Sequence, residues 1–234
     1  MSYFLDAFHT AFKLLISFDS ETYGVVFLSL KISVIAILIS ALIGIPLGLV
    51  ISLKKFYFKN FVVNVVNTFM GLPPVVVGLV LYILLSNQMG IFGDFRLLFT
   101  QTAMVIAQVL LAIPIICGLT IIAIHEIDDN IRKTAISLGA TPLQTTRAIV
   151  AEARYGIISS LIVGFGRLMA EVGAVMMVGG NIRFQTRVMT TAIAMHKGMG
   201  EFEQALALGI ILLLTSFIIN FILSHFRSRK EYVL

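Results

Sequence analysis

Residues 25–53 read VVFLSLKISVIAILISALIGIPLGLVISL, and this stretch decides the fold class. Lys31 is its only charged residue, and an apolar run longer than about 18 residues with so little charge is typical of a transmembrane helix. A helix of this length would extend about 43 Å, more than the ~30 Å hydrocarbon core, so we expect tilt or protruding ends. The GxxxG spacing of Gly44 and Gly48 favours close helix contact, and Pro46 favours a kink.

The composition of the whole chain agrees with this interpretation. Of its 234 residues, 59% are hydrophobic and only 12% are charged, against about 25% charged in a soluble domain. The mean hydropathy is +1.01. The net charge of +5 could suggest nucleic acid, but no basic tract is interleaved with aromatic residues. We therefore expect a lipid bilayer, and no nucleic acid, as a partner.

Further apolar blocks predict one all-α transmembrane domain over residues 1–234. Apolar residues at helical spacing indicate an interfacial helix within residues 1–20, and residues 125–155 form a long polar insertion. Gly71, Pro73 and Pro74 should break the second span, because the two prolines lack amide donors. The five predicted spans lie at about 25–53, 61–85, 97–124, 156–180 and 205–226.

The distribution of Lys and Arg predicts the orientation. The 54–59 loop, the 125–155 insertion and the C-terminal segment carry ten of them, and the opposite side carries five. Cytoplasmic loops are enriched in these residues. We therefore expect a multi-pass protein with its N-terminus outside and its C-terminus in the cytoplasm.

Catalytic chemistry is not indicated. Cys117 lies inside an apolar block, and the four histidines are far apart in sequence, so neither a nucleophile and base nor a metal-ligand set is predicted. No G-x-x-x-x-G-K-[ST] motif occurs, so the chain should not bind ATP itself. We expect no cofactor, no metal and no enzymatic activity.

The polar insertion contains a predicted helix–turn–helix. Gly139 can adopt the left-handed conformation that ends a helix, Thr141 can cap the next helix, and Pro142 suits its first position. This pattern predicts a knob on the cytoplasmic face. An amphipathic helix pair lying on the membrane would have the same pattern.

Two groups of polar residues near the later spans could carry function. Arg167 and Glu171 are four positions apart, so on one helix they would share a face. They could tie the fourth span to a neighbouring helix or lie in a substrate path, because a buried charge needs a partner or water. The second group could donate hydrogen bonds to a tetrahedral oxyanion, or it could be a solvated loop that contacts another protein. Its members are Asn181, Arg183, Thr186, Arg187 and Thr190.

Several motifs resemble a known family. Lys133-Thr134-Ala135, followed by Gly139 and Ile149, is similar to the EAA loop of permease subunits of ATP-binding-cassette (ABC) importers, and Gly71-Leu72-Pro73-Pro74 matches the broken second helix of that family. The stretches 167–174, 179–182 and 186–193 resemble the molybdate, tungstate and sulfate branch. The second of these stretches looks most like the tungstate type.

The resemblance implies the type I ABC importer architecture in a prokaryotic plasma (inner) membrane. The implied partners are a second copy of the chain, two cytoplasmic ABC ATPases and an extracytoplasmic oxyanion-binding protein. The implied function is ATP-driven oxyanion import, with tungstate favoured over molybdate or sulfate. A gradient-driven secondary carrier is the alternative, although the inverted repeats common in such carriers are not found.

The family motifs and the polar groups described above together assign roles to residues. The positions expected to couple the chain to the ATPase are Lys133, Thr134, Ala135, Ser137, Leu138, Gly139 and Ile149. The positions expected in the translocation path or gate are Gly71, Pro73, Pro74, Arg167, Glu171, Asn181, Arg183, Thr186, Arg187 and Thr190.

Overall fold

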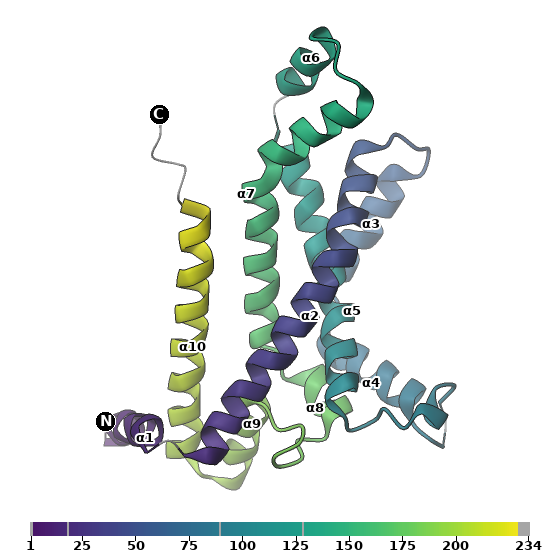
Figure 1. The fold of residues 1–234 in the computed structure, drawn as a ribbon. Helices are drawn as coiled ribbons and strands as arrows, with labels where there is room; N and C mark the ends of the chain where they lie inside the picture. Colours follow the sequence, from purple (N-terminus) through teal and green to yellow (C-terminus); the bar gives the residue numbers. More distant parts are fainter. Residues whose placement is uncertain (1, 18, 89, 128, 229–234) are drawn as a thin grey trace.

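The structure is a computed structural model that describes residues 2–17, 19–88, 90–127 and 129–228. Long helices lie side by side, α1 lies across one end of the bundle, and α6 projects from the other end (Figure 1). This arrangement confirms the predicted all-α fold. The long helices are α2 (Ser20–Leu53), α5 (Gln101–His125), α7 (Pro142–Met169) and α10 (Phe202–Ser228).

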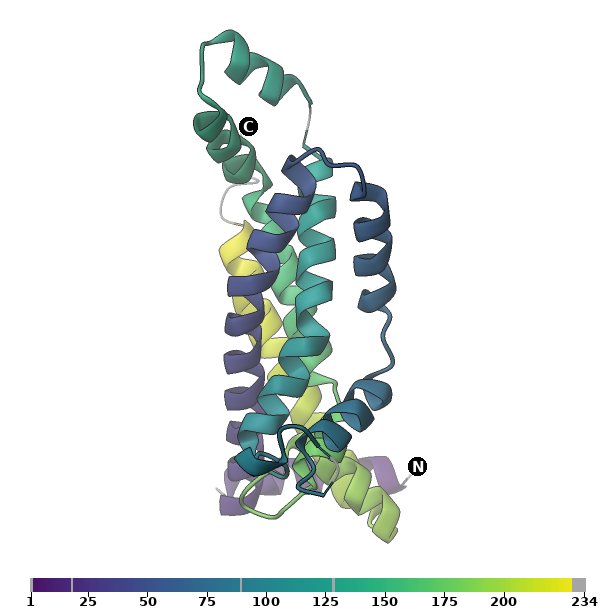
Figure 2. The ribbon, with the colours of Figure 1, turned by 90° about the vertical axis from the view of Figure 1, so that its right-hand side faces the viewer.

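The described part of the chain contains four helices that are each long and apolar enough to cross a membrane. The pair α3 (Lys59–Met70) and α4 (Pro74–Leu85), which bend by 92° at their junction, counts as a fifth span if the two helices cross the membrane together (Figure 2). At the end of α3, the amide of Gly71 donates a hydrogen bond to the carbonyl of Thr68. Pro74 then begins α4 at a position where a missing amide hydrogen removes no bond. The predicted break at this point is confirmed.

The structure differs from the prediction in the fourth span. A single span was expected at 156–180, but α7 already begins at Pro142 and ends at Met169. A separate short helix, α8 (Gly173–Gly179), follows it. The amides at the start of α8 are no longer bonded within α7, so the new helix needs its own hydrogen-bond acceptor.

Helices α2 and α5 pack closely because α2 presents small residues to α5. A Cβ atom on Gly48 would lie 2.7 Å from the Cβ of Thr120, and one on Gly44 would lie 3.1 Å from the carbonyl oxygen of Ile113. Both distances leave little or no room for a larger side chain. The close contact expected from the GxxxG spacing is confirmed.

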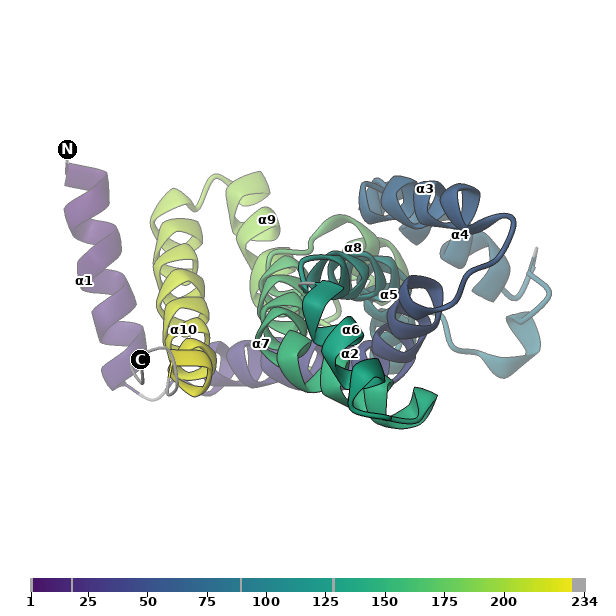
Figure 3. The same ribbon diagram turned by 90° about the horizontal axis from the view of Figure 1, so that it is seen from above.

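The two ends of the bundle carry different segments. The 54–58 loop, α6 (Asp129–Ser137) and the last turns of α10 lie at one end, which we call the α6 end (Figure 1). The opposite end, which we call the α9 end, carries α1 (Ser2–Ile16), the short helix η1 (Gly93–Phe95) and α9 (Met189–Met199). Seen along the bundle, α1 lies beside α10 (Figure 3). The loops that the Lys and Arg count assigned to the same side of the membrane therefore lie at the same end of the bundle.

Candidate coupling knob and translocation path

A left-handed glycine ends α6. Gly139 has a φ of +78°. Its amide donates to the carbonyl of Ile136, and the amide of Ala140 donates to the carbonyl of Ala135. This pair of bonds is the Schellman motif, which needs a residue with positive φ at the position of Gly139. The predicted turn is confirmed.

The next helix begins with the predicted cap. The Thr141 hydroxyl accepts from the amide of Gln144 at 3.4 Å, and the Gln144 side chain accepts from the Thr141 amide at 2.8 Å. Pro142 occupies the first turn of α7. This reciprocal pair satisfies amides that would otherwise be free, and it stabilises the start of α7. We call residues 129–144 the knob.

The knob presents apolar side chains to solvent. Leu138 is 82% exposed, and Ile136 and Leu143 are also exposed. The knob projects beyond the ends of α2 and α5, away from the bundle (Figure 2). Exposed apolar side chains are typical of a surface that contacts another protein or a membrane.

The predicted coupling residues are divided between two places. Lys133, Thr134, Ser137 and Leu138 are exposed on the knob, as is Gly139, and Ala135 is partly buried. Ile149 is buried with Ile124, Ala153 and Ile157. Ile149 therefore anchors α7 to α5 and does not reach the exposed surface.

Glu171 caps a helix instead of pairing with Arg167. Its side chain is 6% exposed, and its Oε1 atom accepts from the Ala174 amide at 2.9 Å. The Thr190 hydroxyl donates to the Glu171 carbonyl at 2.8 Å. Since α7 ends at Met169, the two charged residues do not share a helix face. The expectation that the two residues share one helix face is wrong, because the chain leaves α7 before Glu171, which supplies the acceptor that α8 needs.

Arg167 lies in the last turn of α7 and is exposed. It forms no ion pair or hydrogen bond with any residue that the structure describes. Within a membrane-spanning helix such an arginine needs water or a charged partner. The lone charge is therefore available to a partner outside this chain.

The broken second span packs against α8. A Cβ atom on Gly78 would lie 2.7 Å from the Cα atom of Ala174, and one on Gly173 would lie 2.8 Å from the side chain of Val75. The bend at Gly71, Pro73 and Pro74 places α4 against α8. The predicted path residues at this bend therefore lie close to the helix α8.

Arg183 and Arg187 share one carboxylate at the α9 end. Glu21, in the first turn of α2, accepts from Nη2 of Arg183 at 2.6 Å and from Nη1 of Arg187 at 3.0 Å. The bond to Glu21 raises the pKa of the Arg183 guanidinium. Hydrogen bonds from Thr22 lower the pKa of the neighbouring Asp19 carboxyl, which caps α2. Sequence reasoning missed Glu21, which lies 162 residues from Arg183.

The other predicted donors at this end are mostly used within the chain. The Thr186 hydroxyl donates to the Gly179 carbonyl at 2.5 Å, and the Thr190 hydroxyl bonds to Glu171. Asn181 adopts a φ of +52°, and its buried Oδ1 atom has no partner among the described residues. The bond from Thr186 to Gly179 holds the loop between α8 and α9 in place. Within the part of the chain that the structure describes, no three His, Cys, Asp or Glu side chains gather as metal ligands.

Apolar spans, a broken second span and a projecting helix–Gly–helix knob together define a multi-pass permease of the ABC importer type. Residues 44–232 match the family described as the binding-protein-dependent transport system inner membrane component. The chain belongs to this family. It is therefore a multi-pass plasma-membrane protein and a transport component.

The chain is similar to permease proteins of uptake systems over nearly its whole length. It is 42% identical to the tungstate uptake system permease protein TupB of Peptoclostridium acidaminophilum, over 94% of this chain and 96% of that protein. It is 37% identical to TupB of Campylobacter jejuni, over 95% of this chain and 92% of that protein. A bacterial alginate ABC transporter, solved with its periplasmic protein, has the same fold, with a TM-score of 0.74 and 20% sequence identity. The match covers 95% of this chain and 86% of the transporter chain. The chain is thus an ABC importer permease of the tungstate, molybdate and sulfate family.

Proposed function

We propose that this chain is the membrane-spanning subunit of an ATP-driven tungstate importer. The proposal is supported by the two relatives named as tungstate permeases and by the knob, whose exposed Leu138 is the observation that carries it. An exposed apolar knob at the end of a transport protein needs a partner that covers it. That partner is an ABC ATPase on the cytoplasmic side, which is the α6 end.

The knob can transmit movement to the middle of the membrane. The reciprocal bonds of Thr141 and Gln144 join it firmly to α7. Ile149 packs α7 against α5, and α7 continues without a break to Met169. A displacement of the knob by the ATPase therefore moves the α7 segment that carries Arg167. This movement would alternate access to the path between the two sides of the membrane.

Arg167 is suited to the path. A lone guanidinium attracts a doubly negative oxyanion, and no carboxylate among the described residues pairs with Arg167. Two copies of the chain facing each other would present two such charges across a shared path. We infer that the functional unit is a homodimer, and that Arg167, Gly71, Pro73 and Pro74 contribute to its path or gate.

The outer partner would bind at the α9 end. The exposed Arg183, held by Glu21, is the charged group that the loop between α8 and α9 presents there. A binding protein that delivers the oxyanion would contact this loop. Asn181, Thr186, Arg187 and Thr190 would keep the loop in the conformation that is recognised.

Reconstitution into lipid vesicles tests the proposal. The chain should be purified with its ATPase and binding-protein partners, and uptake of tungstate, molybdate and sulfate should be measured with and without ATP at the ATPase side. We expect tungstate uptake that requires ATP and all three components.

The alternatives give different results in the same vesicles. Preferential uptake of molybdate or sulfate would reassign the substrate within the same family. Uptake by the chain alone, driven by an ion gradient and insensitive to ATP, would contradict the proposal and support a secondary carrier.

A further inference from the structure

A basic pocket lies at the α6 end of the bundle, where the loop after α2 meets α5 and α6. Its volume is about 190 Å³, and its polar lining consists of Ser52, Lys55, Lys59, His125 and Arg132. Neither Asp nor Glu is among the described residues that line it. The pocket is therefore complementary in charge to an anion.

Two of these side chains have unused hydrogen-bonding capacity. The Lys59 ammonium donates to the Ser52 carbonyl at 2.6 Å, which leaves two of its three hydrogens free. Ser52 is 8% exposed, and its hydroxyl has no partner among the described residues. A buried hydroxyl without a partner is unfavourable. An anionic oxygen in the pocket would satisfy it.

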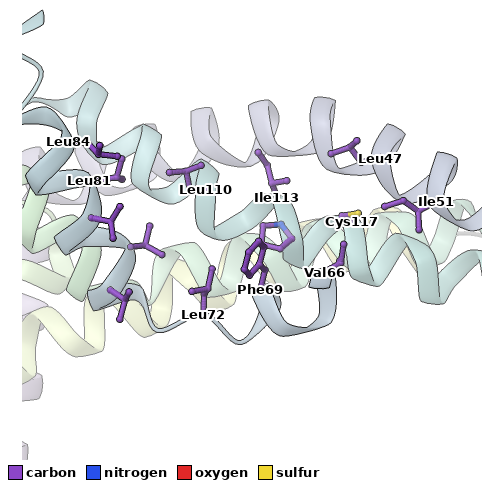
Figure 4. A pocket seen from close by; sticks show the side chains of 14 residues that line it. Leu47, Ile51, Val66, Phe69, Leu72, Leu81, Leu84, Leu110, Ile113 and Cys117 are labelled. Atoms are coloured by element: carbon purple, nitrogen blue, oxygen red, sulfur yellow. The ribbon is translucent and has the colours of Figure 1, made fainter. Parts of the chain in front are cut away.

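An apolar groove begins beside this pocket. It has a volume of about 550 Å³ and lies between the broken pair α3 and α4 on one side and α2 and α5 on the other (Figure 4). Ile51, which lines the groove, precedes Ser52 in α2. Val66 of the groove lies seven residues after Lys59 of the pocket in α3. Cys117 of the groove lies seven residues before Ile124 of the pocket in α5. Seven residues are about two helical turns on one face, about 10.5 Å, so the two sites follow the same seam.

The loop beside the pocket has the composition of a membrane interface. Tyr57 is 96% exposed, and Phe58 and Phe61 are also exposed. Aromatic residues of this kind gather at the level of the lipid headgroups, and Lys54 and Lys55 directly precede them. The basic pocket therefore lies at headgroup depth, and the groove lies at the depth of the acyl chains.

We propose that the pocket and the groove together bind one anionic phospholipid. Its phosphate contacts Lys55, Lys59 and Arg132, and one acyl chain lies along Val66 and Cys117. Basic pockets at the membrane surface between helices recognise anionic headgroups in this way. A second copy of this chain would not supply the negative charge, because this end of the molecule is rich in Lys and Arg.

The site would connect the lipid to the knob. Arg132 belongs to α6, whereas Lys55 and Lys59 belong to the α2–α3 segment. A phosphate held between them ties α6 to the membrane. This role does not depend on which oxyanion the transporter carries.

Native mass spectrometry of the transporter, purified with its partner subunits, tests the site. Phosphatidylglycerol and phosphatidylcholine with identical acyl chains should be titrated separately. We expect tighter binding of phosphatidylglycerol. The variant Lys55→Gln/Arg132→Gln spares the bond between Lys59 and Ser52. It should weaken phosphatidylglycerol binding about 25-fold, because each charge removed weakens binding about fivefold. The affinity for phosphatidylcholine should not change.

Two controls separate lipid from other occupants. Lys13→Gln/Arg96→Gln removes two exposed charges at the α9 end and should change neither affinity. Val66→Trp fills the groove and should weaken binding of phosphatidylglycerol, whereas inorganic phosphate should not displace the lipid.

Four results would overturn the proposal: equal affinity for the two lipids, no effect of Lys55→Gln/Arg132→Gln, displacement by phosphate alone, or lipid binding to the isolated chain that disappears in the complete transporter. The last result would assign the pocket to a contact with the ATPase.

Discussion

Glu171 has a role that depends on its oxygen atoms more than on its charge. Its Oε1 atom accepts the Ala174 amide in a buried site. Glu171→Ala should lower the free energy of unfolding by about 1–2 kcal/mol, because it leaves that amide without an acceptor. Glu171→Gln keeps an acceptor oxygen and should restore most of the loss. Thermal unfolding in detergent measures both changes.

Arg167 provides the control for this prediction. Arg167→Gln should leave the unfolding temperature unchanged, since the guanidinium has no partner in the described part of the chain. It should nevertheless reduce oxyanion uptake. If Arg167→Gln destabilises the protein as much as Glu171→Ala, or if a charge swap between the two restores stability, the capping role of Glu171 is wrong.

At the scale of helices, the contact between α2 and α5 depends on glycine. A Cβ atom on Gly48 would meet Thr120 at 2.7 Å and the Cys117 carbonyl oxygen at 2.8 Å. Gly48→Ala should therefore destabilise the protein by about 1–3 kcal/mol, the usual range for an overpacked core. Gly24→Ala is a matched control on the same helix, because a Cβ there meets nothing within 4 Å. Equal stability of the two variants would contradict close packing at Gly48.

The knob gives a prediction about coupling. Gly139 is exposed, and a Cβ there meets no atom within 4 Å, although its φ of +78° strains any other residue by about 1–2 kcal/mol. Gly139→Asp should leave the protein folded, yet it places a charge on the surface that the ATPase would cover. We expect ATP hydrolysis to continue while oxyanion uptake falls.

Gly139→Ala controls for the backbone strain at this turn and should retain most of the uptake. Gly200→Asp has a similar φ of +81° and equally open surroundings, but it lies at the other end of the molecule. It should match Gly139→Asp in unfolding temperature. Normal uptake by Gly139→Asp would exclude this role for the knob.

The sequence predicted those structural features that depend on residues close together in the chain. Gly139, Thr141 and Pro142 lie within four positions, and their turn follows from the conformational preferences of those residue types. The bend between α3 and α4 follows similarly from adjacent prolines. The end of α7 has no such signal, because no proline interrupts residues 166–172. The expected span therefore continued past the true end of α7.

The contacts that define the site depend on the whole fold. Glu21 and Arg183 are 162 positions apart, and Lys31 and Gln101, which share a 3.0 Å hydrogen bond, are 70 apart. No periodicity within one segment relates such residues. The sequence could therefore supply the candidate arginines of the path but not their partners. Among the described residues Arg167 has no partner, whereas Arg183 and Arg187 are paired with Glu21, and this difference follows only from the assembled bundle.

The whole molecule has two chemically different ends, and this difference predicts its orientation. Leu138 at the α6 end is 82% exposed, and Phe184 at the α9 end is 69% exposed. The native Cys117 is only 2% exposed, so it gives a low labelling background. With a maleimide that does not cross membranes, Leu138→Cys should react only from the cytoplasmic side and Phe184→Cys only from outside. Cytoplasmic loops are the ones enriched in Lys and Arg. Reversed labelling would place the knob outside the cell, where no ATPase could reach it, and would contradict both the orientation and the proposed coupling.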